Sequence, residues 1–361
     1  MTTTITGVEF RPLLVPSSIE DADAGDFIEM TNVRNQVYRE ISGHDDHAMT
    51  PAALLPHFAP DPYQERFTWV VVDDGRIVGR VGLDLPNEEG SRVAFWLVEL
   101  LKEVHGRGLG SQAYAMVEAI AREHGRTVLQ TWAEHNELPG PRLAPPTGFG
   151  SVPAEETAVR FLAKHGYSLE QVERCSAFDL QSSFDEVERL LASARESSAG
   201  YRVISWFAPA PSEYVDGYAQ LKARMVTDAP AAALEFDEEV WDEARVRTNE
   251  RKYLDGGATL RVVAAQRIAT GQLVAFSELS IERDHTKASS QGDTLVLSEH
   301  RGHQLGLLVK CENLLAWREF APRSPRVITY NAEENRPMLD INETVGFRPI
   351  SYEGAWKKVL S

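Results

Sequence analysis

The stretch Asp74-Gly-Arg-Ile-Val-Gly-Arg-Val-Gly-Leu83 decides the fold, because the chain contains a version of it twice. It recurs as Thr270-Gly-Gln-Leu-Val-Ala-Phe-Ser-Glu-Leu279, at an offset of 196 positions. In both versions a glycine turn signal precedes an apolar run, a pattern typical of a β-hairpin. A repeat of this kind indicates two copies of one structural unit.

A second, glycine-rich block recurs at the same offset, so the repeat is not confined to one hairpin. Later matches keep the same order: 131–134 corresponds to 329–333 after a small slip, and 166–167 corresponds to 346–347. The members of the second block that recur are Glu103, Gly106, Leu109 and Gly110, which become Glu299, Gly302, Leu305 and Gly306.

The copies differ in length at 136–153, a segment with five prolines and three glycines. Proline removes a backbone donor and glycine is flexible, so we predict an inserted loop without regular helix or strand. A loop after a strand can shape a binding pocket, although a passive surface insertion fits the sequence equally well.

Length and composition predict two domains. The chain has 361 residues, 43% of them hydrophobic and 25% charged, whereas single cores stop growing near roughly 250–300 residues. The repeat places a first domain at 1–182, a linker helix at 183–200 and a second domain at 201–361.

Charge and cysteine content exclude several classes of function. A net charge of -17 opposes binding to nucleic acid, which depends on Lys and Arg. Cys175 and Cys311 lie far apart without metal-ligand spacing, so we expect two buried thiols, no disulfide and no metal. Without an apolar leader or a membrane span, we expect a cytoplasmic protein, monomeric or homodimeric.

Periodicity predicts a similar order of elements in each copy. In the first copy we expect strands at 8–13, 67–72, 76–85, 92–100, 127–131 and 167–180, a helical or turn region at 51–65, and helices at 26–40, 113–121 and 154–165. In the second we expect strands near 260–266, 272–282 and 294–297, and helices at 307–320 and 336–345.

The segment Glu103-Val-His-Gly-Arg-Gly-Leu-Gly-Ser111 lies between a predicted strand and a predicted helix. Free amides and the helix dipole at such a junction attract an anion, phosphate above all. Glycines at 106, 108 and 110 let a diphosphate approach the backbone, and Arg107 adds positive charge. A tight turn without a ligand is the plainer alternative.

Two other phosphate motifs fit less well. A dinucleotide-binding fingerprint requires a parallel βαβ unit, whereas antiparallel strands precede this loop. A P-loop requires Gly-Lys-Ser/Thr, which does not follow here.

The two loops resemble the signature Arg/Gln-x-x-Gly-x-Gly/Ala of the GNAT N-acetyltransferase superfamily, and the resemblance covers nearly the whole chain twice. Asn335 with Met338, and Val345-Gly-Phe347, also resemble family features that follow this signature. The resemblance implies an α+β chain of two tandem GNAT folds, each a mixed, mostly antiparallel twisted sheet flanked by helices. It implies coenzyme-binding residues Leu100, His105, Gly106, Arg107, Gly108, Leu109, Gly110 and Ser111 in the first copy, and Val296, Arg301, Gly302, His303, Gln304, Leu305, Gly306, Leu307 and Asn335 in the second.

The resemblance implies that a primary amine of a small-molecule acceptor attacks the thioester of acetyl-CoA directly. A backbone N–H near Leu100 or Val296 would stabilise the thioester oxygen. The family's usual acid, a tyrosine four residues before the later glycine, is Leu162 in one copy and Asn342 in the other. An acyl-CoA sensor without catalysis is therefore the alternative.

Side chains for proton transfer are less well defined by the sequence. Acidic and histidine residues near the expected strand opening include Glu99, Glu103, His135 and His303, any of which could be a solvated surface group. The hypothesis for the catalytic set is Glu278, Glu299, Tyr330 and Asn342.

Overall fold

The computed structural model describes residues 7–361, which form two compact units. The first unit comprises the chain up to Glu173, together with Ala231–Asp237 and Ser351–Ser361. The second comprises Arg174–Pro230 and Glu238–Ile350. The chain therefore passes between the units within strands β8 and β14 as well as through the 231–237 segment.

A sheet with the strand order β1-β2-β3-β4-β5-β14-β8 forms the centre of the first unit. Its neighbours are antiparallel where β1, β2, β3 and β4 meet, and parallel where β4 meets β5. The strands are β1 (Val8–Pro12), β2 (Gln64–Asp73), β3 (Arg76–Pro86), β4 (Val93–Leu100), β5 (Val128–His135), β8 (Ser168–Asp179) and β14 (Arg348–Val359).

The hairpin between β2 and β3 confirms the turn predicted from the sequence. Asp73 lies opposite Arg76, which leaves a two-residue loop. Asp74 and Gly75 both have positive φ, 48° and 81°, the conformation that suits a tight hairpin between twisted strands.

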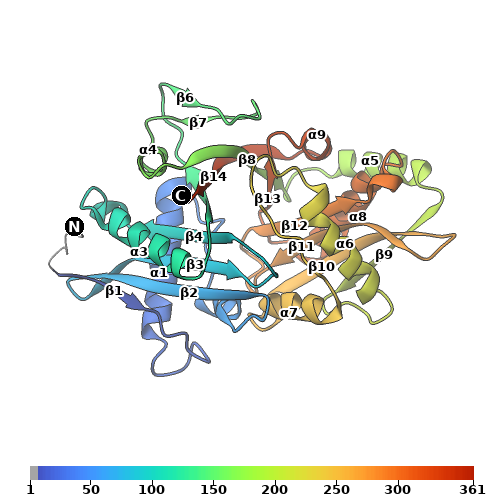
Figure 1. Cartoon of the computed structure of the whole chain (residues 1–361). Helices are drawn as coiled ribbons and strands as arrows, with labels where there is room; N and C mark the ends of the chain where they lie inside the picture. Colours follow the sequence, from blue (N-terminus) through green and yellow to red (C-terminus); the bar gives the residue numbers. More distant parts are fainter. Residues whose placement is uncertain (1–6) are drawn as a thin grey trace. The chain divides into compact units, whose positions relative to one another are not determined.

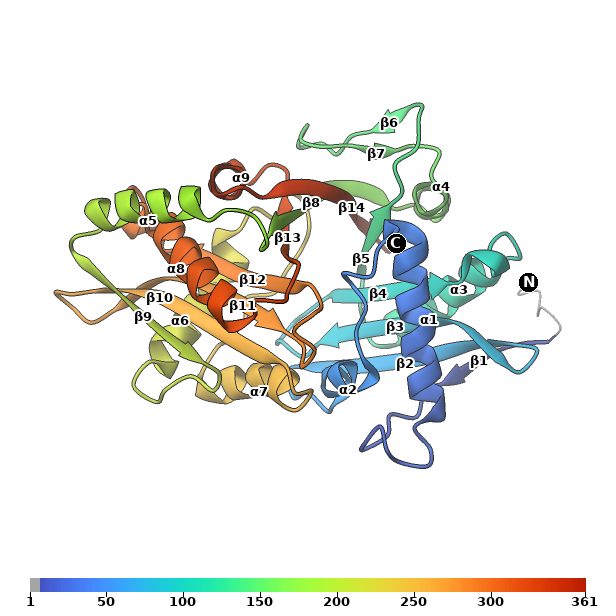
Figure 2. The same cartoon turned by 180° about the vertical axis from the view of Figure 1, so that it is seen from behind.

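Helices cover both faces of this sheet. Figure 2 shows α1 crossing the face opposite to the one on which α3 lies in Figure 1. Helix α1 packs on β3, β4 and β5, and α3 packs on β3 and β4. The helices of the unit are α1 (Gly25–Ser42), α2 (Pro51–Leu54), η1 (Leu55–Phe58), η2 (Lys102–Val104), α3 (Leu109–Glu123) and α4 (Thr157–Lys164).

The inserted segment 136–153 differs from the prediction of an irregular loop. Two short strands, β6 (Arg142–Leu143) and β7 (Val152–Pro153), pair within it. Arg142 also donates from its guanidinium to the backbone carbonyl and hydroxyl of Ser151 at 2.6 and 3.1 Å. A two-residue ladder needs few donors, so the prolines do not prevent it.

The second unit repeats the same arrangement, with the strand order β8-β13-β12-β11-β10-β9. Its antiparallel strands β9 to β12 are followed by a parallel pair, β12 with β13. The elements are α5 (Asp185–Ser197), β9 (Tyr201–Phe207), α6 (Val215–Asp228), α7 (Glu243–Leu254), β10 (Thr259–Arg267), β11 (Leu273–Ile281), β12 (Ser289–Val296), η3 (Ser298–His300), α8 (Leu305–Phe320), β13 (Arg326–Ala332) and α9 (Arg336–Val345).

Backbone hydrogen bonds confirm the repeat at the offset found in the sequence. The Leu101 N–H donates to Val78 O at 2.9 Å, and the equivalent Leu297 N–H donates to Val274 O at 3.0 Å. The short helices η2 and η3 begin at equivalent positions, Lys102 and Ser298.

The division of the chain is less simple than the expected 1–182, 183–200 and 201–361. The C-terminal strand β14 belongs to the first unit, where Tyr352 to Val359 pair with His135 to Val128 of β5. The position of β14 in the sequence does not reveal which strand it pairs with.

The segment 231–237 also belongs to the first unit. Gln130 exchanges two hydrogen bonds with the backbone of Glu235, at 2.7 and 2.8 Å. The Phe236 ring lies 6.1 Å from Phe95 and 6.2 Å from Trp132 between ring centroids. These contacts attach the segment to β4 and β5.

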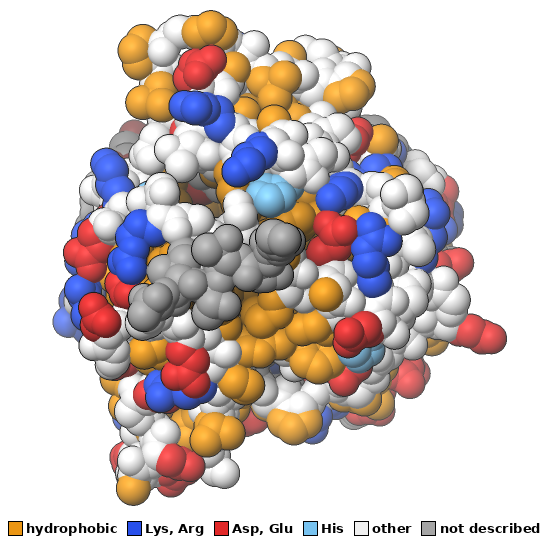
Figure 3. All heavy atoms as spheres, turned by 60° about the vertical axis from the view of Figure 1, so that its left-hand side comes forward, with side chains coloured by type: hydrophobic (Ala, Val, Ile, Leu, Met, Phe, Trp, Pro, Cys, Tyr) orange, Lys and Arg blue, Asp and Glu red, His pale blue; other side chains and the backbone are white. Residues whose placement is uncertain are grey.

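Charged side chains of both signs are interspersed on the face shown in Figure 3, around a group of hydrophobic side chains. The net negative charge therefore does not collect into one acidic field on this face. Within residues 7–361, every helix is too short or too polar to cross a bilayer.

Candidate active site

The glycine loop of the first unit has the backbone geometry that its glycines predict. After η2, Gly106 and Gly108 have φ of 77° and 87°, a region that other residues adopt only with strain. Gly108 is the N-cap of α3, so free N–H groups of the first helical turn lie beside the loop. This is the geometry of an anion site.

Gly110 lets α3 approach its neighbours closely. A Cβ atom at this position would lie 3.3 Å from the Phe161 ring and 3.9 Å from the Leu100 side chain. In the second unit, a Cβ atom on Gly306 would lie 3.1 Å from Ile341 and 3.5 Å from Val296. In both copies a larger residue here would press on an apolar side chain, which would have to shift by a few tenths of an ångström.

The first residue of the signature has the same structural role in both copies. In the first, His105 Nε2 lies 3.0 Å from Leu100 O, which as a carbonyl can only accept, so Nε2 carries the proton. In the second, Arg301 Nε donates to Val296 O at 3.4 Å. Each side chain thus holds the last carbonyl of the strand that precedes the loop.

Strands β4 and β5 separate beyond the pairing of Phe95 with Gln130. Because the Leu101 N–H points to β3, alternation directs the N–H and C=O groups of Trp96, Val98 and Leu100 to the opposite side, toward the opening. We call this opening the fork.

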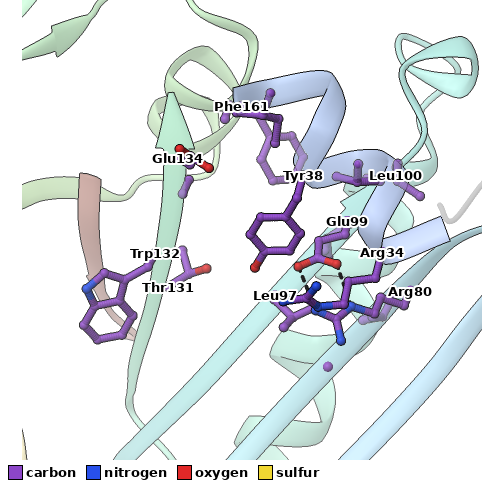
Figure 4. Close-up of a pocket in the computed structure, with 18 of the residues that line it drawn as sticks. Arg34, Tyr38, Arg80, Leu97, Glu99, Leu100, Thr131, Trp132, Glu134 and Phe161 are labelled. Carbon is purple, nitrogen blue, oxygen red and sulfur yellow. Dashed lines mark hydrogen bonds and ion pairs between the residues drawn. The ribbon is translucent and has the colours of Figure 1, made fainter. Parts of the chain in front are cut away.

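A cavity of about 1450 Å³ adjoins the fork, and all of its lining residues belong to the first unit. It extends from the glycine loop to side chains of α1, several of which appear in Figure 4. The predicted coenzyme-binding residues that line it are Leu100, His105, Gly106, Gly108, Leu109, Gly110 and Ser111.

Arg107 is the exception among the predicted residues of this loop. Its guanidinium donates to both carboxylate oxygens of Asp73, at 2.5 and 2.9 Å, and it is not among the residues that line the cavity. The cations that do line it near the loop are Lys102, Arg160 and Lys164, of which the last two come from α4. Sequence reasoning missed them because α4 lies some fifty residues after the loop.

A polar group lies on the α1 face of the cavity (Figure 4). Arg80 donates to the two carboxylate oxygens of Glu99 at 2.5 and 2.9 Å. Burial alone would raise the pKa of Glu99, but the charge and hydrogen bonds of Arg80 outweigh it and lower that pKa. Glu99 is therefore ionised.

Tyr38, from α1, projects into the cavity beside Glu99. The negative charge of Glu99, together with burial, raises the pKa of the Tyr38 phenol. Tyr38 thus keeps its proton at neutral pH and can donate it.

Two further carboxylates line the cavity from neighbouring strands, Glu134 on β5 and Glu353 on β14. Burial, followed by the charges of Glu173 and Glu134, holds the pKa of Glu353 well above its usual range. Tyr38 and Glu353 carried no motif in the sequence, and Glu134 was noted only within the recurring block 131–134. The three were not linked to one site, because α1, β5 and β14 meet only in the folded sheet.

The second loop has the same backbone conformation as the first, although one of its glycines is replaced by a glutamine. Gln304, at the position of Gly108, is the N-cap of α8 and has φ of 55°. The ring of His303 lies 5.4 Å from that of Tyr201. Leu305 is buried, Leu307 packs against the core, Gly302 has φ of 86°, and Asn335 caps α9 by accepting from the Met338 N–H at 3.4 Å.

The four residues of the predicted catalytic set lie in the second unit, on β11, η3, β13 and α9. Glu278 is buried and accepts from Tyr218 and from Lys222. Glu299 lies in η3 and accepts from the Ser298 hydroxyl at 3.0 Å. Tyr330 lies on β13, and the Asn342 amide donates to Asn331 at 2.7 Å.

Of the base candidates in the first copy, only Glu99 lines the cavity. Glu103 is ion-paired with Arg76 at 2.7 Å on the surface, and His135 is buried against Glu156 at 3.1 Å. Cys175 and Cys311 are both buried, as expected, and neither forms a disulfide. Among residues 7–361, no cluster of three or more His, Cys, Asp or Glu side chains could hold a metal ion.

Similarity to solved structures defines the class of fold. The chain is similar to a tandem GNAT protein from the clavulanic acid biosynthesis pathway, solved without acetyl-CoA, with 24% identity, 98% of each chain covered and a TM-score of 0.74. It is also similar to a GCN5-related N-acetyltransferase from Sphaerobacter thermophilus, with 15% identity, 99% and 97% covered and a TM-score of 0.64. Saccharomyces cerevisiae N-myristoyltransferase with myristoyl-CoA and inhibitors has 10% identity, 99% and 82% covered and a TM-score of 0.57.

These similarities show that the chain has the tandem GNAT fold. Residues 30–140 match the acetyltransferase (GNAT) family model, so this part of the chain is a GNAT domain within a tandem GNAT fold. The match over these residues indicates acyl transfer from acyl-CoA. Among curated proteins, none matches this sequence.

Proposed function

We propose that the protein transfers the acetyl group of acetyl-CoA to a primary amine of a small molecule, and that the cavity of the first unit is the site of transfer. One observation carries the proposal. A single cavity joins the glycine loop at the start of α3 to the polar groups beside α1, by way of the fork. A donor bound at one end and an acceptor bound at the other would meet there.

The loop end of the cavity suits the diphosphate of the coenzyme. Free amides at the start of α3 and the cations Lys102, Arg160 and Lys164 provide a positive environment. The N–H groups of β4 that face the fork, at Val98 and Leu100, could stabilise the thioester oxygen. Acetyl-CoA itself supplies an activated acyl group.

The α1 end of the cavity suits proton transfer. Glu99 is held as a carboxylate by Arg80, so it can orient the amine or accept its proton. Tyr38 keeps its proton and lies in the cavity, so we assign to it the donation to the leaving thiolate. In this proposal Tyr38 replaces the family tyrosine, whose position in α4 is occupied by the buried Leu162.

The test is release of free thiol by the full chain with acetyl-CoA and a panel of amines. We expect turnover with at least one amine, and a fall of about tenfold or more in kcat for Tyr38→Phe. Asn342→Ala, in the second unit, serves as the control and should retain wild-type turnover. Binding of coenzyme A without turnover of any amine would support the sensor function instead.

A further inference from the structure

Glu134 is a buried carboxylate without a hydrogen-bond donor among the described residues. Neither of its oxygens is satisfied, and its side chain is 6% exposed. The nearest group able to carry positive charge is His47, whose Nε2 lies 3.9 Å from Glu134 Oε1. Burial lowers the pKa of His47, so this imidazole does not supply a permanent cation.

Glu353 faces the same space as Glu134. The two residues lie directly opposite each other on β14 and β5, so their side chains project from the same face of the sheet. Both line the cavity. A third carboxylate nearby, Glu173 of β8, accepts from Trp132 Nε1 at 2.7 Å.

The arginines on this side of the cavity are bound to other groups. Arg80 is paired with Glu99, and Arg66 donates to both oxygens of Asp84 at 2.7 Å. Arg34 donates to the backbone carbonyl of His47 at 2.7 Å and lies over the Tyr38 ring. Glu134 and Glu353 therefore have no compensating cation. A second buried negative charge beside Glu134 is unfavourable, so Glu353 keeps its proton until a cation binds between them.

We propose that Glu134 and Glu353 bind a cationic group of the acceptor, an ammonium or guanidinium separate from the amine that is acetylated. An amine must lose its proton before it attacks a thioester, whereas a group held by two carboxylates stays charged. The cation is therefore a second group, and the acceptor is a diamine or a similar polycation. The aromatic faces of Tyr38 and Trp132, which also line the cavity, favour the same charge. This inference rests on the proposed function.

The test compares two primary amines of equal length, 1,4-diaminobutane and 4-amino-1-butanol, which differ by one positive charge. With the wild-type chain and acetyl-CoA, we expect kcat/KM for the diamine to be at least about tenfold higher. Glu134→Gln and Glu353→Gln should each remove most of that preference while leaving the affinity for coenzyme A unchanged. Glu65→Gln is the matched control, because Glu65 is exposed on β2 and does not line the cavity.

Two results would overturn the inference and leave acyl transfer intact. One is equal turnover of both amines by the wild-type chain. The other is an unchanged preference in the Glu134→Gln variant. If neither amine is acetylated, the affinity of the full chain for 1,4-diaminobutane is measured by calorimetric titration. Equal affinity in the wild type and in Glu134→Gln would also contradict the proposal. Failure to bind coenzyme A would count against the proposed function, independently of these amine measurements.

Discussion

Glu134 and Glu333 occupy corresponding positions in the two repeats, yet their surroundings differ. Glu134 has no hydrogen-bond donor among the described residues and lines a cavity. Glu333 accepts from Arg174 through both oxygens, at 2.8 Å each. The same carboxylate is thus unsatisfied in one copy and part of a closed ion pair in the other.

The polar groups on the α1 face of the cavity also differ between the two copies. At the offset of the repeat, Arg80 and Glu99 correspond to Phe276 and Leu295, both buried in the core of the second unit. Backbone hydrogen bonds and glycine φ angles are retained in both copies, whereas the Arg80–Glu99 pair is replaced by apolar residues in the second. The two copies therefore share their fold but differ in the side chains available for chemistry. This difference favours the first unit as the catalytic one.

The largest expected effect is a loss of activity when the glycine loop of the first unit is changed but not when that of the second is. Gly106 and Gly302 both have positive φ, 77° and 86°, with open space where a Cβ would lie. Valine at either position strains the backbone by a similar amount, about 1–2 kcal/mol. We expect Gly106→Val to lower kcat/KM for acetyl-CoA about a hundredfold through loop displacement, and Gly302→Val to lower only the melting temperature. Equal losses of activity would place catalysis in both units.

A second, smaller effect concerns stability at equivalent positions of α3 and α8. Tyr114 donates to Glu118, whereas the corresponding Lys310 is fully buried beside the Phe347 ring. Burial lowers the pKa of Lys310 from 10.5 to about 7. We expect Lys310→Met to raise the free energy of unfolding at pH 7 by about 2 kcal/mol, since methionine fills similar space without a charge.

The pH dependence of this effect follows from the direction of the shift. Between about pH 10.5 and pH 7 the unfolded chain binds a proton at Lys310 that the folded chain does not, so the wild type loses stability as the pH falls. Denaturant unfolding at pH 7 and pH 10 should show the advantage of Lys310→Met shrinking at the higher pH. A constant advantage would show that packing, not charge, is responsible.

The smallest effect concerns the N-caps. Gln304 adopts the left-handed conformation that Gly108 adopts in the first loop. We expect Gln304→Gly to raise the free energy of unfolding by about 0.5–1 kcal/mol, and Gly108→Gln to lower it by a similar amount. Thermal denaturation of both variants measures this, and changes of the same sign would contradict the equivalence of the two loops.

Local patterns in the sequence predicted much of the fold. The hairpin around Asp74-Gly75 and the helix that ends before Gly125 depend on residues close in sequence. The offset of 196 follows from comparing short local blocks, and the structure confirms all three. Helices α6 and α7 were not predicted, and α7 in particular is strongly polar, so its apolar stripe is weak.

The candidate site was only half predictable. The anion-binding role of the glycine loop can be predicted from its own sequence, because that role needs flexible backbone at fixed spacing. Tyr38, Glu134 and Glu353 come from three distant segments, and none has a local pattern that separates it from an ordinary surface residue. Their role depends on strand pairing and on which arginines already have partners, which only the folded sheet defines.

Strand β14 has a consequence for how the protein is made. It lies between β5 and β8, so the sheet of the first unit acquires a central member from residues 351–359. During synthesis, the β5 edge of the first half stays unpaired until some 200 further residues have been added. In that period the exposed edge can pair with other chains. A protein truncated near residue 200 would therefore be a poor substitute for the natural first half, and its aggregation would reflect a missing strand and not an unstable sequence.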